Sequence, residues 1–450
     1  MKLFIIFLNS LLMSTTAFAQ PDSLWSRTYG GAGNDVCNAM QQTSDGGYIL
    51  AGYTDSFGSG LADFWLVKTN ANGDSLWSRT FGGDGSDVCR AVQETTDGGY
   101  ILAGYTNSFG AGLNDMWLVK TDVNGDSLWS RTFGDSLDDE ATAVRQTADG
   151  GYVVAGNQSW QWGGPYDMWL LKTDADGDSV WSRRYRGEDQ VGYYLCNAMQ
   201  PTSDGGCVLA GSRLVKTDAN GDTLWTHPYF QNAWFARLAY AVVQTVDHGY
   251  LTGGTAYGQE GYSAGWLEKR DANGDSVWFR NYGGTAHDVC YDIEQTDDGG
   301  CVLGGYTYPG EGWNYLDMWI VKTDANGDSL WSLSFGGSGF DFARVVIQTR
   351  DGGYALAGSA EYFGAGGSDM WLVKLGPDVL PAPTGLVVYF TNGELTLRWD
   401  GDSNPYYRIY SNDDPDMSSP TYEGSTSDTS FIITGLSAKR FYYVIGSTEP

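Results

Sequence analysis

The amino-acid sequence predicts an all-β chain, in which a seven-bladed β-propeller of four-stranded blades is followed by a small β-sandwich. Three observations lead to this prediction. A Trp-containing segment close to Asp-Ser-Leu-Trp recurs seven times, at spacings of 52, 52, 52, 44, 53 and 53 residues. Each of the first six repeats holds four short strand patterns, and the seventh lacks a fourth strand that a lone strand at the start of the array can supply.

The second repeat shows the four expected strands, at 88–96, 100–106, 116–122 and 127–133. Apolar residues run almost without interruption through the second and third strands, which is typical of strands buried on both faces between stacked blades. Asn124-Gly125 predicts a two-residue hairpin between the third and fourth strands, because both residues tolerate positive φ. Signals for helices are nearly absent after the N-terminal segment.

The two ends of the array predict a closed ring. The seventh repeat stops after its third strand, Asp369–Leu375, while Asp22–Gly30 is a fourth strand with no blade before it. If this N-terminal strand completes the last blade, no sheet edge between the first and last blades stays unpaired. The fourth repeat is shorter, because Ser212-Arg213 connects its second and third strands directly. We therefore expect that blade to lack a surface loop.

The order of features within a repeat resembles kelch repeats: an apolar strand ending in Gly, a loop, a strand, a turn and then Trp. The kelch double glycine occurs only at Gly253-Gly254 and Gly304-Gly305, and the other copies carry a single Gly. The turn Thr43-Ser44-Asp45-Gly46-Gly47 and its counterparts resemble the Asp-box of secreted propellers. These resemblances imply a propeller, of a kind common in secreted bacterial proteins, and no particular activity.

The N-terminus has the pattern of a signal peptide over residues 1–19. Lys2 is followed by the apolar stretch Leu3–Met13 and the small-residue site Ala17-Phe18-Ala19. No later stretch approaches the 18 apolar residues of a membrane span. We therefore expect a secreted protein (extracellular, at the cell surface or periplasmic), with the propeller over residues 20–376.

Residues 377–383 are Pro-rich and read as a linker. The region 384–450 resembles a fibronectin type III domain. The resemblance rests on Leu395-Thr396-Leu397-Arg398-Trp399, on Tyr407-Arg408-Ile409-Tyr410 and on Leu436, six residues before Tyr442. It implies a sandwich whose core holds the Trp, with a tyrosine corner. The chain stops where the last strand is due, so we expect the domain either to lack that strand or to take it from another chain.

Charge and cysteine usage restrict the function further. The net charge of −29 disfavours nucleic acid and anionic membranes as partners. Four of the six cysteines share one repeat position with Ala in the other copies, which is typical of a small buried slot. We expect free, buried thiols and a monomeric propeller, with Cys37–Cys89 as the only conceivable disulfide.

Binding residues are expected on the face that carries the blade-to-blade loops and the loops between the second and third strands. Long variable loops on a rigid scaffold commonly carry function, and exposed aromatic rings can stack on sugars or anchor a protein. The candidates are the aromatic residues of these loops that the repeat does not explain: Trp160, Trp162, Tyr257, Tyr262, Trp313 and Tyr315. The alternative is that these rings pack against neighbouring loops.

Two sets of Asp residues precede the first and third strands and converge on the same face. The first set is Asp35, Asp87, Asp139, Asp288 and Asp341, and the second is Asp63, Asp115, Asp167, Asp317 and Asp369. They could bind calcium, but turns capped by Asp explain them without a metal, so no cofactor is predicted. The three histidines, at 227, 248 and 287, show no ligand spacing, and no catalytic motif appears.

The leading hypothesis is a non-enzymatic binding or adhesion module that recognises a glycan or an extracellular protein through its loop-rich face. The alternatives are a carbohydrate-active enzyme that uses carboxylates in the central funnel, and an extracellular scaffold without a specific ligand. An enzyme requires two carboxylates that face one cleft in perturbed environments.

Overall fold

The structure is a computed structural model that describes residues 21–378 except 161–164, 187–193, 230–236, 258–262, 285–286 and 309–314, together with the backbone of six strands between 387 and 447. The segment 1–19, where a signal peptide is expected, lies outside the described residues. The chain divides into a propeller unit, Asp22–Pro377, and a second unit that contains Asp378–Pro450. Among the described residues, no helix is long and apolar enough to cross a membrane.

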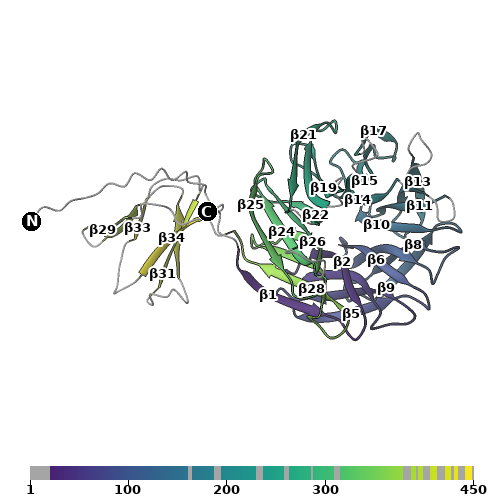
Figure 1. The fold of residues 1–450 in the computed structure, drawn as a ribbon, viewed down its shortest axis with the longest axis horizontal. Helices are drawn as coiled ribbons and strands as arrows, with labels where there is room; N and C mark the ends of the chain where they lie inside the picture. Colours follow the sequence, from purple (N-terminus) through teal and green to yellow (C-terminus); the bar gives the residue numbers. More distant parts are fainter. Residues whose placement is uncertain are drawn as a thin grey trace, which may run out of the picture. The chain divides into compact units, whose positions relative to one another are not determined.

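The propeller unit consists of seven four-stranded antiparallel sheets arranged in a ring (Figure 1). Blade 1 contains β2 (Asp35–Gln42), β3 (Tyr48–Thr54), β4 (Asp63–Thr69) and β5 (Ser75–Phe81). Blade 2 contains β6 (Asp87–Glu94), β7 (Tyr100–Thr106), β8 (Asp115–Thr121) and β9 (Ser127–Phe133). Blade 3 contains β10 (Asp139–Gln146), β11 (Tyr152–Ser159), β12 (Tyr166–Thr173) and β13 (Ser179–Tyr185). The predicted strands of the second repeat agree with these bounds to within two residues at each end.

The remaining blades repeat this order. Blade 4 contains β14 (Cys196–Pro201), β15 (Cys207–Gly211), β16 (Arg213–Thr217) and β17 (Thr223–Pro228). Blade 5 contains β18 (Arg237–Gln244), β19 (Tyr250–Tyr257), β20 (Ser263–Arg270) and β21 (Ser276–Tyr282). Blade 6 contains β22 (Val289–Gln295), β23 (Cys301–Thr307), β24 (Asp317–Thr323) and β25 (Ser329–Phe335). Blade 7 contains β26 (Phe342–Gln348), β27 (Tyr354–Glu361), β28 (Ser368–Leu375) and β1 (Ser23–Tyr29).

The N-terminal strand closes the ring, as predicted. β1 pairs antiparallel with β28, with Ser26 opposite Val373 and Tyr29 opposite Met370. The two ends of the propeller unit are also joined by a hydrogen bond from the Gly376 amide to the Asp22 carbonyl. The short fourth repeat is confirmed as well, because a single residue, Ser212, separates β15 from β16.

The apolar cores lie between neighbouring blades and are built from the same positions in each repeat. Between blades 7 and 1, for example, Leu372, Leu50 and Cys37 are all fully buried in one cluster. The repeated Trp of five outer strands packs edge-on against a Tyr of the next blade, as Trp25 does on Tyr48 at 6.1 Å between ring centroids. The next blade has Cys207 or Cys301 at that position in the other two cases. All six cysteines are free and buried, which confirms the packing interpretation.

One turn differs from its prediction. The connection between β8 and β9 closes with a hydrogen bond from the Asp122 amide to the Asp126 carbonyl, and Gly125 has a φ of +79° whereas Asn124 stays at negative φ. The prediction of a two-residue hairpin was therefore wrong. The Asp122 carboxylate accepts hydrogen bonds from the amides of Asn124 and Asp126, and this Asx interaction stabilises the longer turn.

Every inner strand contains a β-bulge at the same place. In β2 the pairing with β3 shifts between Cys37 and Ala39, so that Asn38 is the bulged residue. The residue opposite is Gly52, where a Cβ atom would lie 1.8 Å from the Val36 carbonyl oxygen. The repeated Gly at the end of the second strand is thus required by the close approach of the bulged backbone.

The second unit contains two three-stranded sheets, with strand orders β29-β30-β33 and β32-β31-β34. Its strands are β29 (Val387–Thr391), β30 (Glu394–Arg398), β31 (Tyr406–Asn412), β32 (Thr421–Thr426), β33 (Ser430–Ile433) and β34 (Phe441–Ser447). Trp399 and Leu436, on which the fibronectin type III resemblance partly rests, lie outside the described residues.

Candidate functional site

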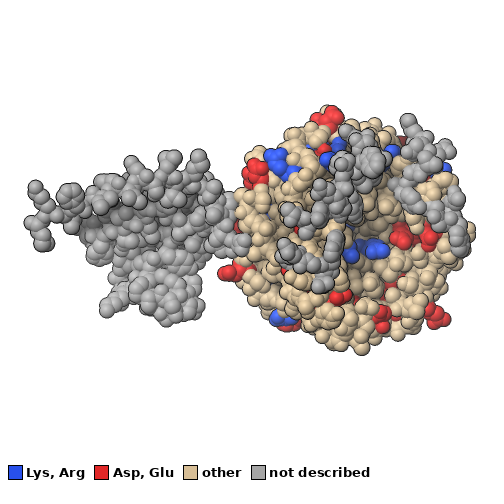
Figure 2. Space-filling model, viewed as in Figure 1, with Lys and Arg blue, Asp and Glu red and all other residues tan. Residues whose placement is uncertain are grey.

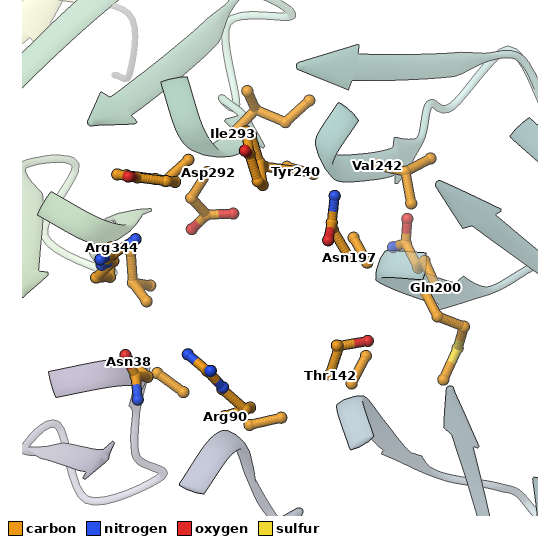
Figure 3. A pocket seen from close by; sticks show the side chains of 18 of the residues that line it. Asn38, Arg90, Thr142, Asn197, Gln200, Tyr240, Val242, Asp292, Ile293 and Arg344 are labelled. Carbon is orange, nitrogen blue, oxygen red and sulfur yellow. The ribbon is translucent and has the colours of Figure 1, made fainter. Parts of the chain in front are cut away.

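A cavity of about 650 Å³ lies in the centre of the ring and is lined by all seven inner strands (Figure 3). The bulged residue of every inner strand lines it: Asn38, Arg90, Thr142, Asn197, Tyr240, Tyr291 and Arg344. Bulges re-aim a side chain and occur frequently beside functional sites. Because inner strands start at the loop-rich face and end at the tight turns, the bulge in the first half of each strand lies toward the loop-rich end.

The bulged position varies from blade to blade more than its neighbours do. The residue before it is Cys or Ala in all seven blades, and the residue after it is Ala in five of them. The bulged residues instead include two amides, two guanidinium groups, two phenols and one hydroxyl. The repeats therefore diverge where the side chains line the cavity and stay alike where the side chains pack.

One wall of the cavity is aromatic. Tyr240 and Tyr291 are 5.3 Å apart between ring centroids, and Tyr291 lies 5.8 Å from Tyr306. Tyr306 in turn meets Phe342 edge-on at 5.3 Å. Tyr240 and Tyr291 line the cavity, and from them an aromatic strip continues through Tyr306 to Phe342 on blade 7, neither of which is a lining residue.

Three guanidinium groups line the cavity, and none of them forms an ion pair within the described part of the chain. Arg344 lies over the Tyr291 ring at 4.2 Å, and Arg90 lies over the Tyr105 ring at 5.6 Å. Arg145 donates a hydrogen bond to the Val144 carbonyl, and burial lowers the pKa of its guanidinium. In the space-filling view, basic atoms lie at the hollow in the middle of the ring (Figure 2).

Three carboxylates also line the cavity. Asp292 occupies a position that is Ala in five blades, and its Oδ2 accepts the amide of Val346 at 3.0 Å. Glu294 accepts the amide of Gln348 at 2.6 Å. Burial raises the pKa of both groups to about 7, and it also raises the pKa of Glu140 on blade 3.

The two carboxylates of blade 6 differ in which residues occupy their positions in the other blades. In three other blades a Gln at the Glu294 position accepts the same amide of the next blade, for example Gln41 from Glu94. Glu294 thus performs a structural task that Gln also performs. Asp292 has no such counterpart among the blades, so its carboxylate is specific to this side of the cavity.

The residues predicted from the sequence as a binding site do not line this cavity where they are described. Trp160 follows β11, half-buried beneath the Arg186 guanidinium at 5.4 Å, and Tyr315 stacks on Tyr308 and is 36% exposed. Tyr257 ends β19, and its side chain is not described. Trp162, Tyr262 and Trp313 lie outside the described residues.

Asp residues of both sets accept hydrogen bonds from amide and hydroxyl groups of the nearby loops. Asp35 accepts hydrogen bonds from the Gly31 amide and the Ser56 hydroxyl, and Asp87 accepts the equivalent bonds from Gly83 and Ser108. Asp63 likewise accepts the Ser59 amide. Within the described ranges no group of three or more His, Cys, Asp or Glu side chains could hold a metal ion.

Sequence reasoning missed the bulged residues because it treated the inner strand as regular. Alternation of side chains along β2 would place Cys37 and Ala39 on one face and Asn38 on the other, without revealing the extra residue. The available signal was the comparison among repeats: a polar position of changing identity between a Cys/Ala slot and an Ala.

Comparison with known proteins finds structural likeness only at low sequence identity. The chain matches no protein-family model and no curated protein. Among solved structures, it resembles a protein of unknown function from Bacteroides caccae (13% identity, TM-score 0.41, 65% of this chain and 98% of that one). It also resembles YCF48 from Cyanidioschyzon merolae (11%, 0.42, 78% and 98%) and the quinohemoprotein alcohol dehydrogenase ADHIIG from Pseudomonas putida HK5 (11%, 0.41, 82% and 79%). At these values the likenesses carry no inference about function.

Proposed function

We propose that this protein is an extracellular glycan-binding module that receives its ligand in the central cavity from the loop-rich face. The observation that carries the proposal is the ring of seven bulged residues, which differ among otherwise similar blades and line one cavity. The export pattern of residues 1–19 supports a location outside the cell, and the fibronectin type III resemblance supports a spacer role for the second unit.

The chemistry of the cavity favours a sugar over an apolar ligand. Its volume of about 650 Å³ lies within the range of small-molecule sites. Amide and hydroxyl side chains such as Asn197 and Thr142 can exchange hydrogen bonds with sugar hydroxyls, while the Tyr240–Tyr291 strip offers rings for stacking. Asn38 and Asn197 are held in place by hydrogen bonds to carbonyls of the next blade, at Cys89 and Ala239.

A glycan array probed with the exported chain tests the proposal. Tyr240→Ala should weaken binding to the glycans that the unchanged protein retains, whereas Tyr315→Ala should leave it intact if the cavity is the site. The reverse result would place recognition on the loop aromatics. Melting curves of both variants check that the ring still folds, and an array without any bound glycan would contradict the proposal.

A carbohydrate-active enzyme is the second candidate, because Asp292 and Glu140 are two carboxylates with raised pKa values on opposite sides of one cavity. A carboxyl group with a pKa near 7 can act as a general acid at neutral pH. Incubation with the retained glycans should then release new reducing ends, and Asp292→Asn should abolish the release. Glycans recovered intact would reject the enzyme and leave the binding module.

A further inference from the structure

We infer that the central cavity selects an acidic glycan and binds a sugar carboxylate between the guanidinium groups of Arg90 and Arg344. This inference deepens the proposed function and rests on it, since it names the class of sugar that the same cavity would take. It follows from the positions of the two arginines, from their unpaired state and from the balance of charge around them.

The two arginines flank one blade. Arg344, Asn38 and Arg90 are the bulged residues of blades 7, 1 and 2, which are consecutive in the ring, and all three line the cavity. In Figure 3 the Arg90 side chain extends toward the middle of the cavity, and Arg344 lies beyond Asn38 on the same side. Burial raises the pKa of the Tyr53 hydroxyl on β3 of blade 1, and the charges of both Arg90 and Arg344 oppose that shift, so both groups lie near Tyr53.

Among the described residues, neither guanidinium group forms an ion pair with a carboxylate, unlike most basic side chains of the propeller. Most described basic side chains of the propeller are paired: the third-strand lysines bind Asp-box carboxylates, and the outer-strand Arg79 binds Asp126 at 3.0 Å. Arg90 and Arg344 form no ion pair within the described residues although the protein carries 55 acidic groups against 26 basic ones.

Both side chains are instead held by aromatic rings. Arg344 lies 4.2 Å from the centroid of Tyr291 and 5.6 Å from that of Phe342, and Arg90 lies 5.6 Å from that of Tyr105. A guanidinium group that stacks on a ring keeps its in-plane N–H donors available for an anion. The Nε atom of Arg344 is buried and has no hydrogen-bond acceptor in the described part of the protein.

Carboxylates on the blades next to those of the two arginines limit the charge of the ligand. Asp292 and Glu294 lie on blade 6, and Glu140 lies on blade 3, next to the blade that carries Arg90. The charge of Arg90 lowers the pKa of Glu140 against the larger, opposite effect of burial, although the two groups form no ion pair among the described contacts. A dianionic phosphate would face repulsion from these carboxylates. A single planar carboxylate can accept hydrogen bonds from two guanidinium groups and carries only one negative charge. This favours a uronic acid or a similar acidic sugar as the ligand.

Matched ligands test the inference on the full chain. Calorimetric titration would compare oligogalacturonates, their methyl esters, which keep the ring and lose the charge, neutral galactan and sulfated galactan. We expect binding of the acid, weakened about tenfold or more by esterification, by Arg90→Gln or by Arg344→Gln. Arg344→Lys should bind at an intermediate level, because it keeps the charge and loses the bidentate geometry. Arg131→Gln, on an outer strand, is the control and should bind as the unchanged protein does.

The outcomes separate the inference from the function on which it rests. Equal binding of acid, ester and neutral glycan, unchanged in the Arg variants, would overturn the carboxylate site and leave a glycan-binding cavity. Preference for sulfated galactan would overturn the carboxylate in favour of a sulfate. An absence of binding by any acidic glycan, on this panel and on the array, would overturn the inference, and loss of all glycan binding would reject the proposed function with it.

Discussion

At the scale of single residues, each blade uses its third-strand Lys to hold the Asp-box turn. The Lys322 ammonium group is 0% exposed, and it donates to the Asp298 carboxylate at 2.7 Å and to the Thr323 carbonyl at 2.9 Å. The same Asp also accepts hydrogen bonds from its own turn, here from Thr296 and Gly300. The short Asp-box motif is therefore bound to the core of its blade by a buried cation.

Removing the Asp should cost most where the Lys is most buried. We predict that Asp298→Ala lowers the free energy of unfolding by about 2 kcal/mol or more, because a buried ammonium loses its counter-charge. Asp149→Ala is the matched control: its side chain is 66% exposed and pairs with the less buried Lys172, so its loss should cost under about 1 kcal/mol. Denaturant titration of both variants measures the difference, and equal costs would contradict the argument.

At the scale of the strands, hydrogen bonds at the ends of the inner strands join neighbouring blades. The last residue of an inner strand accepts an amide from the turn of the preceding blade, as Gln146 does from Thr96 and Gln348 from Asp297. The same kind of hydrogen bond joins blade 7 to blade 1, where the Arg350 amide donates to Gln42 at 3.0 Å. Blades 7 and 1 are therefore also bonded to each other on the inner side of the ring, away from the closing strand β1.

Deletion of residues 22–30 should nevertheless destabilise the whole propeller. It would expose the edge of β28 and remove Trp25 from the core that it shares with Tyr48. We predict a fall in Tm of roughly 10 °C or more, since about 1 kcal/mol corresponds to roughly 2 °C in a domain of this size. Removal of residues 378–450, which belong to the other compact unit, is the control and should leave the propeller transition in place. A deletion variant that melts like the full ring would disprove closure by β1.

At the scale of the whole molecule, two groups of carboxylates act on stability in opposite directions. Hydrogen bonds and Lys charges oppose the effect of burial and hold the pKa of Asp45, Asp97 and three further Asp-box residues at about 2. The stability that this group contributes is present above about pH 4 and is lost as the pH falls toward 2. Burial instead raises the pKa of Asp292, Glu294 and Asp139 to about 7. The folded state then binds protons more tightly than the unfolded chain, so stability falls as the pH rises from about 4 to 7.

The protein should therefore be most stable at mildly acidic pH. We predict a maximum of Tm near pH 4 to 5, with Tm lower at pH 7.5 and again at pH 2.5. The net charge of −29 adds repulsion at neutral pH, so a variant must isolate the cavity carboxylates. Asp292→Asn combined with Glu294→Gln should reduce the slope of Tm between pH 5 and 7. A maximum above pH 7, or a slope that the double variant leaves unchanged, would contradict this assignment.

The number of blades, their strand order, the closing strand and the buried cysteine slot could all be predicted from the amino-acid sequence. These features depend on local patterns repeated seven times, such as the Trp of Trp25 and the turn at Asp45, and each copy corroborates the others. A repeat is informative because a blade cannot bury its apolar faces alone.

The convergence of the variable polar side chains, in contrast, becomes visible only in the folded ring. Arg90 and Arg344 lie 52 and 306 residues after Asn38 along the chain. The three residues meet because a bulge turns each toward the axis and the ring brings blades 7, 1 and 2 side by side. Neither effect is local: the bulge depends on the partner strand with its Gly, and the convergence depends on closure by β1. The cavity is a property of the closed ring, and no single repeat contains it.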